Sequence, residues 1–332
     1  MNNRGEENEM SISVQNITKS FKDRRNAKER KLILKDISFD VSEGEFVSLL
    51  GPSGCGKTTT LTIIAGFQSP DEGKIVVNGK EVSKPGPDRA FMFQNYALFP
   101  WLKVGENIMY PMKKQKVPKE QRQQRLKELL DMAQLSEYEN YYIHELSGGM
   151  RQRVCIAIGL ACNPRLIIAD EPTTALDVTI QAQILDLMRN LKDKINSSIM
   201  LITHDLGVIA EMADYVVVMY AGRVVEKGTA SEIFKNPSHP YTIGLMRSKP
   251  VVGKKVDKLY SIPGKVPNPI DMPDYCYFRD RCELSCDKCQ GSYPGVIKLS
   301  PTHEVSCYRY ADRPEAGWLA NVHPGEGGKT HE

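Results

Sequence analysis

The apolar residues of this chain follow two patterns: short uninterrupted runs, and longer segments in which they recur at helical spacing. Residues 166–169 form an uninterrupted run, residues 46–50 and 199–203 are apolar at all but one position, and helical patterns follow, as over residues 180–191. A strand that is apolar at every position is buried on both faces, and such strands alternate with helices in parallel sheets. The pattern therefore predicts an α/β fold with a mostly parallel sheet that helices cover on both faces.

Further strands and a helical insertion are predicted around this core. Alternating apolar positions predict strands over residues 11–18, 32–41, 74–77, 89–93, 215–219 and 223–225. Asn78-Gly79 and Ala221-Gly222 are typical hairpin turns. From residue 95 to 145 the pattern is helical, most clearly over residues 119–135. We therefore expect an antiparallel β subdomain and a helical insertion within the α/β domain.

The chain divides into four parts by the character of its residues. We predict a disordered N-terminus over residues 1–10 and an α/β domain over residues 11–235, with a helical subdomain at about residues 95–162. Prolines and cysteines then become frequent, which predicts a small irregular extension over residues 236–312. Residues 313–332 are expected to form a flexible tail.

Composition and charge limit the functions that the chain can have. Of its 332 residues 41% are hydrophobic and 26% charged, as in ordinary globular proteins. The net charge of +3 is too small to indicate a nucleic-acid partner, and acids interrupt the basic residues of the 22–31 segment, where we expect a solvated loop. No apolar run reaches the ~18 residues of a membrane span, and residues 1–9 lack the apolar core of a signal peptide. We expect the chain in the cytosol, or at a membrane only through a partner.

The segment from Gly51 to Thr58 reads G-P-S-G-C-G-K-T and fits the phosphate-binding loop G-x-x-x-x-G-K-[ST] at every fixed position. Its glycines let backbone N–H groups converge on a polyphosphate, and the following helix adds its positive end. Lys57 supplies a cation for the phosphate oxygens, and the Thr58 hydroxyl is a candidate ligand of Mg²⁺. A glycine-rich turn before a helix is the alternative. The candidate nucleotide-binding residues are Gly51, Pro52, Ser53, Gly54, Cys55, Gly56, Lys57, Thr58 and Thr59.

Two adjacent acids, Asp170 and Glu171, follow the apolar strand of residues 166–169. Asp170 is placed to hold Mg²⁺ through water, and Glu171 is placed to polarise an attacking water molecule. A surface pair or a helix cap is the alternative for adjacent acids at a strand end. Together with the phosphate-binding loop, the pair predicts a site of nucleotide hydrolysis.

The octapeptide Leu146–Arg153, L-S-G-G-M-R-Q-R, lies before a helical pattern and ahead of Asp170. It resembles the signature of the ATP-binding subunits of ATP-binding cassette (ABC) transporters, and the resemblance covers roughly residues 11–250. It implies a P-loop fold of the ABC type that binds ATP with Mg²⁺ and hydrolyses ATP. It also implies that Ser147, Gly148 and Gly149 form a second anion site at a helix N-terminus, which closes over ATP held by another subunit.

Four further positions resemble functional residues of the family. Gln94 resembles the glutamine that contacts Mg²⁺ and the attacking water, in a loop that faces the membrane partner. The segment Ala175-Leu176-Asp177 is similar to the loop that crosses the dimer interface beside Glu171. His204 resembles the switch histidine that contacts the γ-phosphate, and Phe21 resembles the aromatic residue that stacks on adenine. In isolation, residues of these types would carry no such assignment.

The resemblance also implies partners. In the family, ATP closes a dimer of two identical or two homologous subunits, hydrolysis opens it, and the opening moves a transmembrane permease. The permease holds the subunits at the cytoplasmic face of the membrane and receives its substrate from an extracytoplasmic binding protein. Long heptad repeats between the motifs, as in DNA-repair members, and a second cassette, as in translation factors, are missing from the sequence. A soluble ABC ATPase without a transport role is nevertheless an alternative.

Two parts of the chain resemble different branches of importers. Residues 144–310 resemble the ATPases of oligopeptide, dipeptide and nickel importers, notably in N-P-S-H-P-Y-T-I-G-L at residues 236–245. Residues 66–108 are more similar to the nitrate, sulfonate and taurine importers, including the compact spacing from Lys57 to Gln94. We favour the peptide or nickel branch on the C-terminal segment and keep a nitrate/sulfonate/taurine-type importer as the alternative.

Five of the eight cysteines lie between Cys276 and Cys307, which in a reducing compartment indicates metal binding before disulfides. The peptide branch often carries a C-terminal cysteine set, which here would be Cys276, Cys282, Cys289 and Cys307, with Cys286 as an additional thiol. Four thiolates suit a [4Fe–4S] cluster or Zn²⁺, and the spacing disfavours an ordinary zinc ribbon. An iron–sulfur cluster is expected ahead of zinc, and unligated thiols are the remaining alternative.

Overall fold

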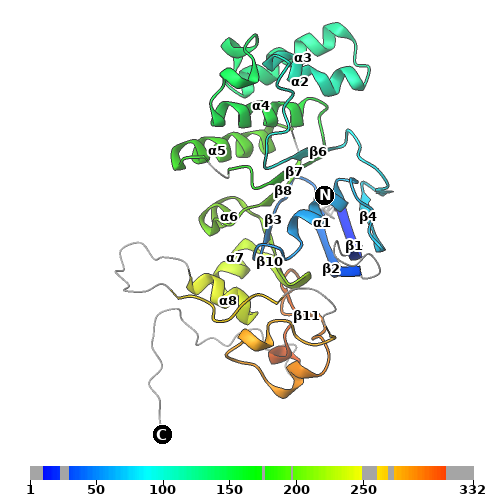
Figure 1. Ribbon diagram of the computed structural model, residues 1–332, viewed down its shortest axis with the longest axis vertical. Coiled ribbons are helices and arrows are strands. Elements are labelled where there is room, and N and C mark those ends of the chain that lie inside the picture. Colours follow the sequence, from blue (N-terminus) through cyan, green and yellow to red (C-terminus); the bar gives the residue numbers. More distant parts are fainter. Residues whose placement is uncertain are drawn as a thin grey trace, which may run out of the picture.

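The computed structural model describes residues 10–22, 30–173, 176–195, 197–248, 260–267 and 273–311. The predicted N-terminal disorder, the solvated loop between the first two strands and the flexible tail fall almost entirely outside these residues, as does Ala175. In the described part of the chain, a group of helices lies at one end of the long axis, the large sheet lies in the middle, and the cysteine-containing segment lies at the other end (Figure 1).

The large sheet contains eight strands among the described residues. They are β3 (Phe46–Leu50), β6 (Arg89–Met92), β7 (Leu166–Asp170), β8 (Ser198–Ile202), β9 (Tyr215–Tyr220), β10 (Arg223–Thr229), β11 (Ile297–Lys298) and β12 (Glu304–Val305). Their order is β11-β12-β10-β9-β3-β8-β7-β6. Neighbouring strands are parallel from β9 to β6, whereas β10, β12 and β11 extend the sheet antiparallel at one edge. The mostly parallel core that the apolar runs predict is therefore confirmed.

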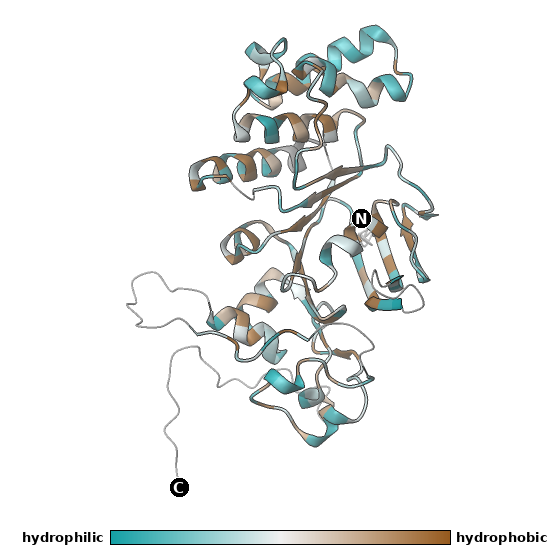
Figure 2. Cartoon of the chain, viewed as in Figure 1, coloured by the Kyte–Doolittle hydropathy of each residue, from teal (hydrophilic) through white to brown (hydrophobic). Residues whose placement is uncertain are grey.

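Eight α-helices surround the two sheets of the molecule. They are α1 (Lys57–Ile64), α2 (Val104–Lys114), α3 (Lys119–Met132), α4 (Gly148–Leu160), α5 (Val178–Ile195), α6 (Leu206–Met212), α7 (Ala230–Lys235) and α8 (Pro240–Arg247) in the described residues. Ile167 and Ala169 of β7 pack into the core formed with α2–α5, whereas Leu166 and Ile168 pack into the core formed with α1. Successive residues of a pleated strand point to opposite faces, so both faces of the large sheet are covered, and its strands are mostly hydrophobic in Figure 2.

A smaller antiparallel sheet packs on the α1 side of the large one. Its strands are β1 (Met10–Lys22), β2 (Arg30–Ser42), β4 (Glu72–Val77) and β5 (Lys80–Glu81), in the order β2-β1-β4-β5. Asn78 and Gly79, between β4 and β5, both have positive φ, of 48° and 73°, as a tight hairpin turn requires. This sheet is the predicted antiparallel β subdomain.

The helical insertion contains α2 and α3, which pack on α4. Leu126, Leu129 and Leu130 form the buried stripe of α3, and the helix ends at Met132, shortly before Gln134 takes a left-handed φ of 58°. In α2 the buried side chain of Asn107 bonds to both backbone groups of Phe99. The loop from β6 into the insertion is thereby fixed in place. No helix in the described part of the chain is long and apolar enough to cross a membrane.

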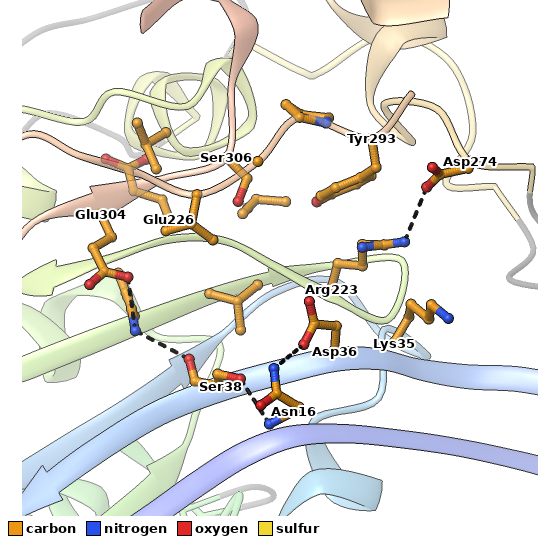
Figure 3. A pocket seen from close by; sticks show the side chains of 17 residues that line it. Asn16, Lys35, Asp36, Ser38, Arg223, Glu226, Asp274, Tyr293, Glu304 and Ser306 are labelled. Carbon is orange, nitrogen blue, oxygen red and sulfur yellow. Dashed lines mark hydrogen bonds and ion pairs between the residues drawn. The ribbon is translucent and has the colours of Figure 1, made fainter. Parts of the chain in front are cut away.

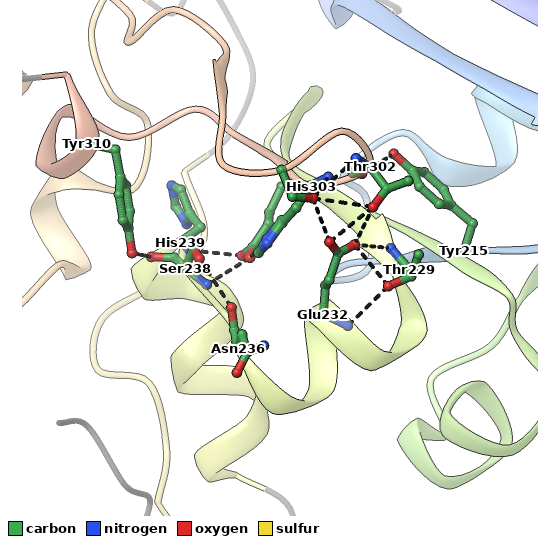
Figure 4. Close-up of polar contacts among 11 residues, drawn as sticks. Tyr215, Thr229, Glu232, Asn236, Ser238, His239, Thr302, His303 and Tyr310 are labelled. Atoms are coloured by element: carbon green, nitrogen blue, oxygen red, sulfur yellow. Dashed lines mark hydrogen bonds and ion pairs between the residues drawn. The ribbon is translucent and has the colours of Figure 1, made fainter. Parts of the chain in front are cut away.

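Two carboxylates of the α/β domain accept hydrogen bonds from the C-terminal extension. Glu226 of β10, which is fully buried, accepts hydrogen bonds from the backbone N–H groups of Ser238 and His239 at 2.7 and 2.8 Å and from Nε2 of His303 at 2.8 Å. Glu232 of α7 accepts from the Thr302 hydroxyl at 3.0 Å (Figure 4). These bonds join residues that are far apart in the sequence, so the extension is seated on the edge of the sheet.

Candidate functional site

The candidate residues from four separate segments meet at one edge of the large sheet. The parallel strands β3, β8, β7 and β6 are neighbours in this order, so their carboxyl ends lie side by side. Lys57 follows β3, His204 follows β8, Glu171 follows β7 and Gln94 follows β6. In open α/β sheets, ligands bind beyond the carboxyl ends of the strands. The topology therefore places these residues where such a ligand would lie.

The loop between β3 and α1 has the backbone of a phosphate-binding loop. Gly54 and Gly56 have φ values of 78° and 101°, which residues with side chains rarely adopt. A Cβ atom at Gly51 would collide with the carbonyl oxygen of Met219, and one at Gly56 would collide with the side chain of Leu34. The glycines are thus required both by conformation and by close packing.

Lys57 places its ammonium group within this loop. Its Nζ donates to the carbonyl oxygens of Gly51 and Pro52 at 2.7 and 3.0 Å. Cys55 is buried beneath it, with Sγ at 4.0 Å from Nζ, and burial raises the pKa of the Cys55 thiol although Lys57 opposes the rise. The cation therefore lies among the loop carbonyls, where the phosphate oxygens of a nucleotide would compete for it.

Asp170 and Thr58 form a pair of oxygen donors beside the loop. Asp170 ends β7 and is buried, and Thr58 lies in the first turn of α1. Burial raises the pKa of Asp170, the hydrogen bond with Thr58 opposes this, and the charge of Glu171 adds to the rise. A carboxylate and a hydroxyl in contact are hard oxygen ligands of the kind that Mg²⁺ prefers. The predicted neighbours of the cation are thus brought together.

Glu171 and Gln94 also meet. Gln94 Nε2 lies 3.4 Å from Glu171 Oε2 and donates to it. Glu171 has a φ of 50°, and its backbone N–H donates to the carbonyl oxygen of Ile202 in β8 at 3.0 Å. A left-handed φ costs a residue with a side chain about 1–2 kcal/mol, and such strain persists mainly where surrounding structure fixes it, as at active sites. The carboxylate is therefore positioned by its backbone.

His204, which follows β8 at this edge, and Phe21, in β1 of the smaller sheet, both lie at the surface. The His204 ring is exposed and forms no hydrogen bond among the described residues, while the next residue, Asp205, caps α6. Phe21 of β1 is 37% exposed, and Lys19 Nζ lies 5.5 Å from its ring centroid. Neither side chain is joined to Lys57 or Glu171, so both are open to contact with a ligand.

The octapeptide motif starts α4. Ser147 is its N-cap and its Oγ accepts from Met150 N at 3.3 Å. A Cβ atom on Gly149 would lie 2.6 Å from Ile180 Cγ2, so the motif packs tightly against the start of α5. Asp177 Oδ1 accepts from the backbone N–H of Ile180 at 2.9 Å. None of the hydrogen bonds formed by the described residues joins Ser147–Gly149 to the loop of residues 51–58.

The segment after Gln94 contains residues that the sequence analysis did not identify. Tyr96 and Ala97 are consecutive residues with left-handed φ values of 46° and 48°. The Cys155 thiol of α4 donates to the carbonyl oxygen of Tyr96 at 2.9 Å. This contact ties the Gln94 loop to the helix that begins at Ser147. The sequence carries no signal for it, because left-handed residues are usually predicted from Gly or Asn.

All five C-terminal cysteines line one small cavity, of about 20 Å³, together with His239 and Arg309. The sulfur atoms of Cys286 and Cys289 are 3.7 Å apart. Burial raises the pKa of Cys276 to about 11 and that of Cys307 to about 12. The five cysteines that the sequence analysis singled out therefore do lie close together in the structure. Their present arrangement does not form a ligand set, since the described residues contain no group of three or more His, Cys, Asp or Glu side chains placed to hold a metal ion.

Comparisons with known proteins bear on the same segments. Residues 34–174 match the family model "ABC transporter", and residues 225–289 match "Oligopeptide/dipeptide transporter, C-terminal region". The oligopeptide transport ATP-binding protein AppD of Bacillus subtilis is 44% identical over 296 residues, which cover 83% of this chain and 90% of that protein. The dipeptide transport ATP-binding protein DppD of Bacillus subtilis is 39% identical over 334 residues, which cover 94% of this chain and 98% of that protein.

Solved structures of ATP-binding cassettes share the fold. The ATP-binding cassette MJ0796, in a dimeric post-hydrolysis state with ADP and Pi, aligns with a TM-score of 0.60 and 32% identity, over 66% of this chain and 98% of that chain. CbiO1 of Clostridium perfringens, part of the complex cbiONQ, aligns with a TM-score of 0.62 and 25% identity, over 68% of this chain and 91% of that chain. The similarity thus spans nearly the whole of each cassette.

Proposed function

This chain belongs to the ABC transporter ATP-binding family and carries the oligopeptide/dipeptide transporter C-terminal region, and from this we infer that it is the ATPase that powers a peptide importer. The chain binds ATP and hydrolyses it. The observation that carries the proposal is the meeting of Glu171 and Gln94, 3.4 Å apart, at the same sheet edge as the phosphate-binding loop. A module that binds ATP without hydrolysing it would not need a carboxylate that is positioned there by a strained backbone.

We propose the following roles at this edge. The loop from Gly51 to Thr59, with Pro52, Ser53, Gly54, Cys55 and Gly56, surrounds the phosphates, and Phe21 stacks on adenine. Thr58, Gln94 and Asp170 hold Mg²⁺, which would neutralise charge on the phosphate oxygens. Glu171 takes up the proton of the attacking water, and His204 contacts the γ-phosphate. What supports the roles of the residues that end β3, β6, β7 and β8 is their common sheet edge, together with the contacts of Asp170 with Thr58 and of Gln94 with Glu171. The role of Phe21 rests on the family resemblance alone.

We further propose that the complete site needs a second ATP-binding subunit, either a copy of this chain or a homologous one. Ser147, Gly148 and Gly149 would meet the nucleotide of the partner, with Asp177 at the interface. The proposal is supported by the separation of the octapeptide motif from the phosphate-binding loop within one chain. It is also supported by the dimeric state of the similar cassette MJ0796. ATP would close such a dimer and hydrolysis would open it.

The transport partners follow from the relatives named above. We propose that permease subunits hold this chain at the cytoplasmic face of the membrane as a peripheral subunit, and that an extracytoplasmic binding protein delivers the substrate. The domain limits predicted from the sequence, with the cassette at residues 11–235 and the extension at residues 236–312, are part of this proposal. We propose no nucleic-acid partner.

Oligopeptides or dipeptides are the proposed cargo, with nickel as the other cargo of the same branch. The match of residues 225–289 to the oligopeptide/dipeptide transporter C-terminal region supports this choice, as do relatives that match over most of the chain. The likeness of residues 66–108 to nitrate, sulfonate and taurine importers receives no support from the relatives named above. We keep an importer of the nitrate/sulfonate/taurine type as a minor alternative, because this segment is the one that we expect to contact a permease.

For the cysteines we propose a [4Fe–4S] cluster ahead of zinc. The proposal is supported by donor chemistry, since Cys276, Cys282, Cys289 and Cys307 line one cavity. The cavity, at about 20 Å³, holds no more than a water molecule, so the thiols would have to move apart to take up a cluster. Anaerobic purification followed by iron and zinc analysis tests it. Zinc without iron, or neither metal, would overturn the cluster.

The test of the function is an ATPase assay with and without its permease. Full-length protein is assayed alone and in vesicles that contain the permease encoded beside it, with a binding protein and a short peptide. Peptide-stimulated hydrolysis together with peptide uptake is expected. Hydrolysis that ignores permease and peptide would favour a soluble ABC ATPase, and stimulation by a sulfonate or nitrate would favour the other branch.

A further inference from the structure

A cavity of about 480 Å³ lies between the small sheet, the β10 strand and the C-terminal extension. Figure 3 shows side chains from all three parts pointing into it, among them Lys35 and Asp36 of β2, Arg223 of β10 and Tyr293 of the extension. Pockets of roughly 300–1,000 Å³ take small-molecule ligands. The cavity is separate from the site of ATP, because its lining contains no residue of the 51–58 loop.

Two basic side chains that line this cavity each have a nitrogen atom without a hydrogen-bond partner among the described residues. Arg223 Nε is buried and forms no hydrogen bond among the described residues, although Nη2 of the same side chain lies 3.5 Å from Asp274 Oδ1. The guanidinium also contacts the Tyr293 ring, with Cζ 3.9 Å from the ring centroid. The exposed Lys35 has no partner for its Nζ among the described residues. A buried N–H without an acceptor is unfavourable, and the Arg223 side chain would have to shift before Nε could donate to a ligand in the cavity.

Acidic groups face the same space. Asp36 Oδ1 accepts from Asn16 Nδ2 at 2.7 Å, no hydrogen bond to its second oxygen is formed by the described residues, and the Asp274 side chain is 72% exposed. Asn16 and Asp36 have left-handed φ values of 51° and 54°, at irregularities in the pairing of β1 with β2. Bulges of this kind redirect side chains and often occur beside functional sites.

The balance of charge selects the kind of ligand. Lys227 is paired with Glu304 at 3.0 Å, and Glu226 is saturated by the extension, so these residues need no ligand. What remains is the exposed Lys35, the carboxylate of Asp36, and the pair of Arg223 with Asp274, which at 3.5 Å is longer than that of Lys227 with Glu304. A dianion such as phosphate would be repelled by the carboxylates, and a simple cation would be repelled by Lys35 and Arg223.

We propose that this cavity binds a small zwitterion of the amino-acid or short-peptide type. Its carboxylate contacts Lys35 and Arg223, and its ammonium group contacts Asp36 and Asp274. The assignment of a peptide rests on the proposed function, since a peptide importer delivers such molecules to the side of the membrane where the ATPase lies. The chemistry of the cavity itself rests on the structure alone.

The cavity is connected to the nucleotide site through one turn. The backbone N–H of Lys35 donates to the carbonyl oxygen of Gly222 at 2.8 Å, and the N–H of Gly222 donates to the carbonyl oxygen of Cys55 in the phosphate-binding loop at 3.1 Å. Arg223 directly follows Gly222. A ligand that contacts Lys35 and Arg223 therefore acts on the residues that support the loop, so its binding is coupled to that of ATP. Such coupling is reciprocal by thermodynamic necessity.

The first experiment measures binding to the full chain by titration calorimetry, with alanyl-alanine as the probe. Saturable binding is expected, and N-acetyl-alanyl-alanine and alanyl-alanine amide, which lack the ammonium and the carboxylate charge, should each bind about tenfold more weakly or worse. Lys35→Gln should weaken alanyl-alanine binding by a similar factor, whereas Lys80→Gln, an exposed change in β5, should not. Asp36→Asn should weaken binding of alanyl-alanine but not of its N-acetyl form. Free alanine tests whether the site takes amino acids as well as peptides.

The proposal is overturned by the absence of saturable binding, or by equal binding of alanyl-alanine and its amide. Unchanged affinity in Lys35→Gln would also overturn it. The second measurement is the affinity for ATP, which alanyl-alanine should shift about fivefold in the wild type but not in Lys35→Gln. Peptide uptake in vesicles separates the two proposals. Uptake without binding here overturns this inference alone, and binding here without peptide uptake overturns the proposed cargo.

Discussion

The Nε2 atom of His303 donates a hydrogen bond to Oε1 of Glu226 at 2.8 Å, and both side chains are buried. Glu226 belongs to the strand that extends the large sheet, and His303 belongs to the extension, next to β12. The same carboxylate also accepts the backbone N–H groups that precede α8. One acidic side chain thus satisfies the donors that fasten the extension to the cassette.

Glu226→Ala should destabilise the full chain strongly. The change leaves buried N–H groups of Ser238, His239 and His303 without an acceptor, and we expect the free energy of unfolding to fall by about 3 kcal/mol or more. Urea denaturation measures the loss. Glu81→Ala, an exposed change in β5, is the control and should cost less than about 0.5 kcal/mol. Equal stability of both variants would show that the carboxylate does not hold the extension.

The contrast between this contact and the central sheet shows what a sequence can predict. The run Phe46–Leu50, which is apolar except at Ser48, predicts a buried parallel strand, because the hydrophobic pattern of a strand can be read from neighbouring residues. Glu226 lies in the strand R-V-V-E-K-G-T and looks like an ordinary solvent-facing acid. Its burial depends on a segment almost eighty residues further along the chain, which no local pattern reports. The cavity beside Arg223 escaped the sequence analysis for the same reason.

At the nucleotide site the motifs predicted the residues, and the topology explains their meeting. Gly51–Thr58 and Asp170-Glu171 are recognisable from spacing alone, whereas Gln94 and His204 become meaningful only through the family resemblance. Tyr96 and Ala97, with left-handed φ, were not predictable, because their backbone is set by Cys155 and the neighbouring helices rather than by their own side chains.

Lys57→Gln and Ser147→Arg should affect different steps. The first should weaken ATP binding to one subunit, and the second should prevent the hydrolysis that needs both subunits. In the isolated chain Lys57 lies in the phosphate-binding loop, so Lys57→Gln should weaken ATP binding about tenfold or more. Ser147 is not joined to that loop within one chain, so Ser147→Arg should leave ATP affinity near the wild-type value and abolish hydrolysis by the assembled transporter. Fluorescent-nucleotide titration and phosphate release measure the two effects. A loss of affinity in Ser147→Arg would contradict the composite site.

Alkylation of the metal-free protein should distinguish the C-terminal thiols by pH. Burial raises the pKa of Cys276 to about 11 and that of Cys307 to about 12, so both are protonated and unreactive at pH 8. Their reaction with iodoacetamide should accelerate as the pH rises toward 11, whereas the exposed Cys286 should react first at pH 8. Peptide mass spectrometry gives the order. Equal labelling of Cys307 and Cys286 at pH 8 would contradict the buried arrangement.

Glu171→Gln should stop hydrolysis while sparing ATP binding. The amide keeps the size of the side chain but cannot take up a proton from water, and loss of a general base typically costs about a hundredfold or more in rate. The strained backbone and its bond to Ile202 do not depend on the carboxylate, so the fold should be retained. Phosphate release by the assembled transporter measures the rate, and Glu120→Gln, on the exposed side of α3, serves as the control. Because the Glu171→Gln variant should retain ATP, its subunits should stay together. We therefore expect size-exclusion chromatography of this variant to show a stable dimer in the presence of ATP. Steady-state hydrolysis at the wild-type rate would show that another group activates the water.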